Sequence, residues 1–75
     1  MKKKITVEFE DALIEVCLLG EDYPMGYIYA GEIRPKDGTP YHSFESSFVM
    51  PMKEAADVIY GAWKCNNLAK YQPKY

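Results

Sequence analysis

Few side chains in this sequence are suited to covalent or metal chemistry. There is one histidine, His42, and there are two cysteines, Cys17 and Cys65. A thiol nucleophile would need His42 as its base and an orienting group such as Asp57, but both cysteines fall at positions typical of packing residues, one inside an expected strand and one at the end of an expected helix. No Cys-x-x-Cys or His-x-x-x-His spacing occurs. The sequence therefore predicts no catalytic residues and no metal site.

Phosphate-binding and calcium-binding loops are also missing from the sequence. Gly20, Gly26 and Gly31 are spaced as turn and strand residues rather than as a phosphate cradle. Glu21 and Asp22 are adjacent acids without the pattern of an EF-hand loop. We therefore expect no cofactor and no enzymatic activity, and a protein that acts through its surface.

Length and composition indicate one small globular domain over residues 1–75. The chain is 48% hydrophobic and 27% charged, which is too apolar for a disordered protein. A net charge of -2 disfavours bulk binding to phosphate. Two cysteines are too few for a disulfide scaffold, and the longest apolar run, Val16–Leu19, is too short for a signal peptide or a membrane span. We expect a cytoplasmic protein with no membrane partner.

The elements that must position the surface are four strands and a helix. Residues 5–9 alternate with a period of two, and residues 13–19 are read as a second strand, with a short helix over 11–20 as the alternative. Residues 20–26 have the composition of a loop. Residues 27–34 and 41–49 are expected to form a hairpin around the turn at 35–40.

Apolar residues at a spacing of three to four follow Pro51, which suits the first position of a helix. The helix is expected to end near Asn66 or Asn67, and residues 70–75 are expected to form a flexible tail. The predicted fold class is α+β: a four-stranded antiparallel sheet of two hairpins, with one C-terminal helix packed on one face (ββββα).

Strand periodicity also assigns side chains to the two faces of this sheet. The predicted core comprises Ile5, Val7, Phe9, Ile14, Val16, Leu18, Ile28, Ala30, Phe44 and Phe48, packed against Ile59 and Trp63. The opposite face then carries Thr6, Glu8, Leu13, Glu15, Cys17, Leu19, Tyr27, Tyr29, Ile33, Tyr41, Ser43 and Glu45. That second face is more apolar than an uncovered sheet face normally is, which suggests a binding surface unless the C-terminal segment covers it.

The first functional hypothesis is a non-enzymatic protein-binding module, an accessory subunit or an inhibitor. Small anti-defence proteins of phages and mobile elements are similar in size and acidity. This comparison concerns the kind of protein and involves no shared motif. Tyrosine supplies a large contact area with few rotatable bonds. The residues expected to bind a protein partner are Tyr27, Tyr29, Ile33, Tyr41, Leu19 and Tyr23. The same face also suits a homodimer.

The alternative hypothesis is binding to single-stranded nucleic acid. Four strands followed by a helix is an element order similar to that of single-strand-binding families such as the Pur-alpha repeat and the transcriptional coactivator fold that dimerises through its helices. This resemblance implies that exposed tyrosines stack on bases while nearby cations contact phosphates. The cations expected in that role are Arg34, Lys36, Lys2, Lys3 and Lys4. Glutamates on the same face count against it.

Overall fold

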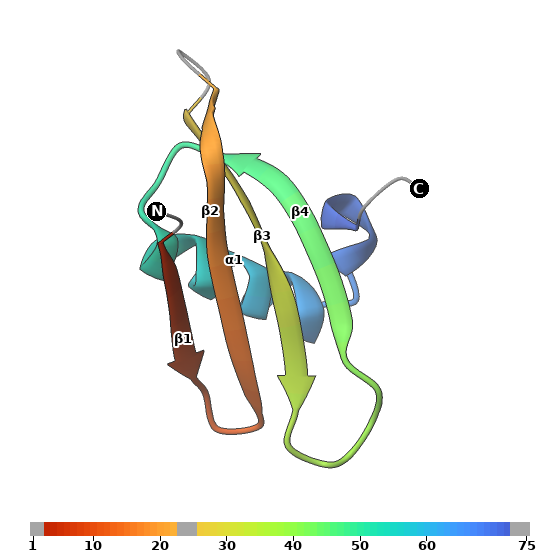
Figure 1. Cartoon of the computed structure of the whole chain (residues 1–75). Coiled ribbons are helices and arrows are strands. Elements are labelled where there is room, and N and C mark those ends of the chain that lie inside the picture. The colour runs from red at the N-terminus through yellow and green to blue at the C-terminus, as the bar shows by residue number, and fades with distance from the viewer. Residues whose placement is uncertain (1–2, 23–25, 73–75) are drawn as a thin grey trace.

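The computed structural model describes residues 3–22 and 26–72, and it confirms the ββββα fold. The sheet is antiparallel and its strands follow chain order, β1-β2-β3-β4. The strands are β1 (Lys4–Glu8), β2 (Ala12–Asp22), β3 (Gly26–Pro35) and β4 (His42–Phe48). Helix α1 (Met52–Lys64) runs across one face, and a short 3-10 helix, η1 (Leu68–Tyr71), lies against β4 (Figure 1).

Strand β2 is a strand and not the short helix considered as the alternative, and it is longer than the sequence predicts. The loop expected from Gly20 is in fact paired structure, because Gly20 and Glu21 lie opposite Ile28 and Tyr27. The register shifts between Leu18 and Gly20, which places a β-bulge at Leu19. Since β1 pairs with β2 only as far as Cys17, the β2–β3 hairpin extends beyond β1 (Figure 1).

Helix α1 begins and ends close to the predicted residues. Pro51 is the N-cap rather than the first helical residue, and its carbonyl accepts the first helical hydrogen bond, from the amide of Ala55 at 2.9 Å. Asn66 adopts the left-handed conformation, with φ of 60°, and the amide of Asn67 donates to the carbonyl of Ala62 at 2.7 Å. This is the termination that asparagine favours after a helix.

The core lies between the sheet and α1. It consists of Ala12, Ile14, Val16, Tyr29, Ile33, Phe44, Phe48, Ala55, Ala56, Ile59 and Leu68, with Ile5, Val7, Phe9, Leu18 and Trp63 among the partly buried residues packed against it. The predicted face assignment is confirmed for β1, β2 and β4. It is wrong for β3, where Tyr29 and Ile33 point inward and Ile28 and Ala30 point to the other face.

A glycine explains how the inward face of β3 packs. Gly31 lies opposite Val16 on one side and Phe44 on the other, so it belongs to the core face. A Cβ there would collide with the carbonyl of Glu15 and would lie 2.9 Å from the ring of Phe44. The missing side chain therefore lets the Phe44 ring lie over the backbone of β3, where it is 1% exposed.

The β1–β2 turn is tied to α1 by a carboxylate that the sequence analysis did not single out. The Tyr60 hydroxyl donates to Oδ1 of Asp11 at 2.7 Å, and Lys64 Nζ donates to Oδ2 at 2.5 Å. These hydrogen bonds, from Lys64 first and then from Tyr60, lower the pKa of Asp11. Phe9 stacks on Tyr60 with ring centroids 4.0 Å apart. The partners of Asp11 are distant in sequence, so no local pattern indicates the contact.

The described part of the C-terminal segment packs on the helix side of the sheet. Lys70 and Tyr71 belong to η1, and Tyr71 stacks on Phe48 with centroids 5.6 Å apart. Two residues of the expected tail therefore lie in η1, and residues 73–75 lie outside the described part of the chain. The segment does not cover the opposite sheet face through Tyr71. Among the described residues, no helix is long and apolar enough to cross a membrane.

Candidate interaction surface

The sheet face turned away from α1 is the candidate site, and we call it the open face. The strand register arranges its side chains in rows that cross the sheet. The successive rows are Glu8–Leu13–Arg34, then Thr6–Glu15–Glu32–Ser43, then Lys4–Cys17–Ala30–Glu45, then Ile28–Ser47. The half-buried apolar side chains on the two central strands thus form two groups, Leu13 on one side of the Glu15–Glu32 row and Cys17, Ala30 and Ile28 on the other.

Two tyrosines predicted on this face lie on the other one. Tyr29 is 3% exposed, and its hydroxyl donates to the carbonyl of Met50 at 2.8 Å. Burial raises the pKa of Tyr29. Tyr27 projects to the same side and stacks on Tyr29 with centroids 5.9 Å apart, although it is 39% exposed. Ile33 is fully buried in the core. The prediction that Tyr27, Tyr29 and Ile33 lie on the open face is therefore wrong.

The reason is the cost of burying charge. If Tyr29 and Ile33 pointed away from the helix, Glu32 and Arg34 would point into the core, because neighbouring side chains along a strand point to opposite faces of the sheet. Moving an unpaired charge into an apolar interior costs far more than exposing an isoleucine. Placing Glu32 and Arg34 on the solvent side first would have predicted the correct orientation of β3.

The remaining predicted partner-binding residues are spread over the molecule. Leu19 sits at the bulge of β2 and is 43% exposed, and Tyr23 lies outside the described residues. Tyr41 is 60% exposed beside the β3–β4 connection. It lines a hollow of about 440 Å³ together with Arg34 and Pro40. Only Tyr41 among the predicted tyrosines therefore adjoins the open face within the described part of the chain.

Three of the cations expected to contact nucleic acid are paired with carboxylates. Lys4 Nζ lies 3.7 Å from Oε2 of Glu15, and Lys36 Nζ donates to Oε2 of Glu8 at 2.6 Å. The Lys36 hydrogen bond lowers the pKa of Glu8.

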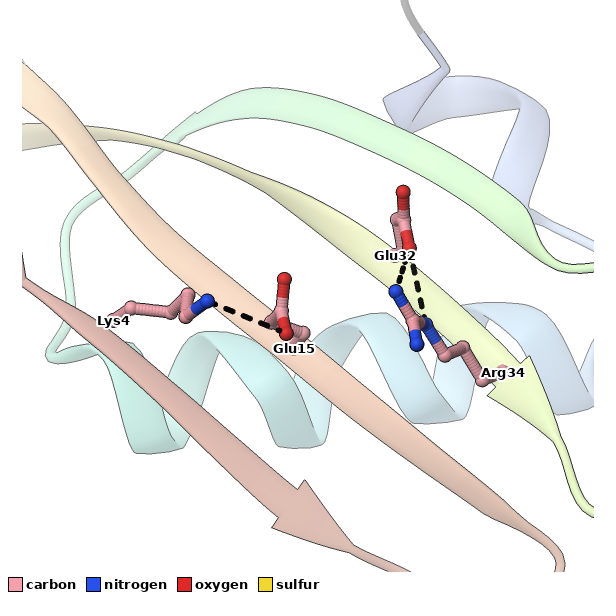
Figure 2. Close-up of polar contacts among 4 residues, drawn as sticks. All are labelled: Lys4, Glu15, Glu32 and Arg34. Carbon is pink, nitrogen blue, oxygen red and sulfur yellow. Dashed lines mark hydrogen bonds and ion pairs between the residues drawn. The ribbon is translucent and has the colours of Figure 1, made fainter.

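Arg34 donates through Nε and Nη2 to Oε2 of Glu32, at 3.1 and 2.9 Å (Figure 2). These hydrogen bonds raise the pKa of Arg34. Lys3 is exposed, and Lys2 lies outside the described residues. Within the part of the chain that the structure describes, the open face therefore does not present a row of unpaired positive charges of the kind that a nucleic-acid backbone requires.

The centre of the open face brings two like charges together. Glu15 on β2 and Glu32 on β3 are direct cross-strand partners, an arrangement that destabilises a sheet. Figure 2 shows how the chain compensates: Lys4 reaches Glu15 from β1, and Arg34 reaches Glu32 from along β3. The charge of each glutamate is therefore compensated by a cation that reaches it from a neighbouring row.

Beside these acids the open face is hollowed. The hollow has a volume of about 300 Å³ and lies over β2, β3 and β4. Its floor is low because the cross-strand neighbours Cys17 and Ala30 are small. Glu15, Glu32 and Glu45 stand around it. The sequence analysis placed Glu15, Cys17 and Glu45 on this face correctly but put Ala30 in the core, so it did not predict a hollow.

The thiols and the imidazole are not arranged as a nucleophile and its base. Cys17 faces the open side of β2, whereas His42 projects to the helix side of β4, beside Trp63 and Leu68. Cys65 is exposed at the end of α1. Within residues 3–22 and 26–72, His42 makes no hydrogen bond to either thiol, and no three potential ligands are placed to hold a metal ion.

Comparisons with protein-family models, with curated proteins and with solved structures found no match for this chain. Fold and site together define its class as a small α+β domain in which helices cover one sheet face and no element within residues 3–22 and 26–72 covers the other. Its function must be argued from that uncovered face.

Proposed function

We propose that the protein is a non-enzymatic protein-binding module that docks a partner on its open face, as an accessory subunit or an inhibitor. The observation that carries this proposal is the number of apolar side chains on that face. Cys17, Ala30 and Ile28 are neighbours on the two central strands, Leu13 lies on the other side of the Glu15–Glu32 pair, and no element among the described residues covers them. An antiparallel sheet with one solvated face normally carries polar residues there.

The make-up of the face suits a protein partner. Its apolar side chains alternate with charged and hydroxyl ones, and protein interfaces likewise combine apolar contacts with hydrogen bonds. Two free cysteines suit a reducing compartment, so we place the interaction in the cytoplasm. The single-stranded nucleic-acid alternative loses part of its support, because Tyr27 and Tyr29, which were expected to stack on bases, lie on the helix side of β3.

The test compares proteins captured from an extract of the cells that carry the gene, using the tagged full chain and three variants. Leu13→Asp places a charge at an apolar position of the open face. Val58→Asp makes the same kind of change at an exposed valine on α1 and is the matched control. Thermal unfolding of each variant shows that it is folded, and Ala30→Gln serves as a second face variant.

We expect a protein that is retained by the wild type and by the Val58 variant and lost by the Leu13 and Ala30 variants. Retention by all four proteins would place the interaction elsewhere and refute the proposal. Light scattering of the purified chain at two concentrations tests the homodimer directly. A dimer that Leu13→Asp dissociates would show that the open face binds a second copy instead of another protein.

A further inference from the structure

We propose that the hollow in the open face receives a cationic side chain, a lysine or an arginine from a basic segment of the protein partner. This inference rests on the proposed function, because it specifies the chemistry of the partner that the same face binds. It rests on the shape of the hollow, on the cross-strand pairing of Glu15 with Glu32 and on the two cations that already contact these acids.

The shape fits a long side chain with a charged end. Cys17 and Ala30 form an apolar floor along which an aliphatic stem can lie. Carboxylates from three strands stand around this floor, namely those of Glu15, Glu32 and Glu45. A cation whose stem covers the floor therefore ends among acceptors on more than one side. That arrangement is the one in which charge-assisted hydrogen bonds are strongest.

The cross-strand pairing of Glu15 with Glu32 favours the binding of a further cation. Glu15 and Glu32 lie opposite each other, which costs sheet stability. The chain places Lys4 on one acid and Arg34 on the other, so these carboxylates already accept both kinds of cation (Figure 2). Both cationic side chains remain mostly exposed, at 59% and 61%. Exposed ion pairs are weak, so a partner's cation can replace them or join them.

Charge argues against two other occupants. Among the described residues, the open face carries four glutamates, Glu8, Glu15, Glu32 and Glu45, against three cations, namely Lys4, Arg34 and the Lys36 that is paired with Glu8. Packing a second copy face to face would double this excess of negative charge in one interface, and like charges there oppose association. A metal ion does not fit either, because among the described residues no three ligands converge closely enough to hold one.

The experiment titrates the isotopically labelled full chain with a hexa-arginine peptide and follows backbone amide shifts and the dissociation constant. The test variant combines Glu15→Gln with Glu32→Gln. The matched control combines Glu54→Gln with Asp57→Asn, which removes the same number of charges from the exposed side of α1. Thermal unfolding is measured for both. The test variant should be at least as stable as the wild type, since it removes the opposed charges.

We expect the amides of Cys17 and Ala30 to shift, the test variant to bind about tenfold more weakly, and the control to bind nearly as well as the wild type. Equal weakening of both variants, or shifts centred on α1, would mean attraction to bulk charge and would overturn the inference.

The two proposals fail in different ways. If the peptide ignores the hollow while Leu13→Asp still abolishes capture of the partner, the cationic chemistry is wrong and the protein-binding function stands. If Leu13→Asp leaves capture unchanged, the proposed function itself is wrong, whatever the peptide does.

Discussion

The orientation of β3 decides which residues form the open face, and one pair of substitutions tests it. Ile33→Ala and Ile28→Ala make the same chemical change on one strand, at positions that point to opposite sides of the sheet. Ile33 is 0% exposed and Ile28 is half-buried. Removing the three outer carbons of a buried isoleucine costs roughly 0.8 kcal/mol each in transfer free energy. The cavity adds to this, so we expect Ile33→Ala to cost about 3–4 kcal/mol.

At Ile28 no cavity forms and part of the side chain is already in water, so we expect a cost of about 1 kcal/mol. A domain of this size has a free energy of unfolding of roughly 4–11 kcal/mol. Ile33→Ala should therefore lower the melting temperature by roughly 15–25 °C, and Ile28→Ala by about 5 °C. Urea unfolding followed by circular dichroism and by Trp63 fluorescence measures both. Equal losses, or a larger loss at Ile28, would refute the assigned orientation and with it the composition of the open face.

Three further predictions concern contacts that hold the fold together. Tyr29→Phe leaves the carbonyl of Met50 without its donor and should cost about 1 kcal/mol of unfolding free energy in urea titrations. Because Lys64 and Tyr60 lower the pKa of Asp11, the stability they contribute is present above its ordinary pKa of 3.8 and is lost as pH falls through the lower folded value. Asp11→Asn should accordingly flatten the melting temperature profile below pH 4, and an unchanged profile would contradict this. Gly31→Ala should cost about 1–3 kcal/mol or more through overpacking, whereas a neutral outcome in thermal unfolding would show that β3 can shift.

Much of the fold could be predicted because its signals are local. The alternation along β1, the Asp37-Gly38 turn and the helical spacing after Pro51 each involve residues only a few positions apart. The end of α1 could be predicted for the same reason, since an asparagine that accepts a left-handed conformation ends the helix by itself.

The candidate surface was harder to predict because it depends on which alternate side chains of β3 point toward the helix. In β3 both alternating sets contain apolar residues, so counting apolar side chains does not separate them. Ile28 and Ala30 suit an inward position as well as Tyr29 and Ile33 do, whereas Glu32 and Arg34 decide the orientation through the cost of burying their charges. The pairing of Glu15 with Glu32 follows only once the register is known, and the bulge at Leu19 has no signal in a single sequence.

The strand order has a consequence for how the chain reaches this structure. Every pair of neighbouring strands is consecutive along the chain, so the whole sheet can assemble by successive hairpin closures over short loops. Such local closures take microseconds, and chains dominated by them fold quickly. The hydrogen bonds of Asp11 with Tyr60 and Lys64 span 49 and 53 positions, and the second closes the longest loop among the side-chain hydrogen bonds of the described residues. We expect the hairpins to form early and the docking of α1 through Asp11 to complete folding, so that Asp11→Asn speeds unfolding more than it slows refolding.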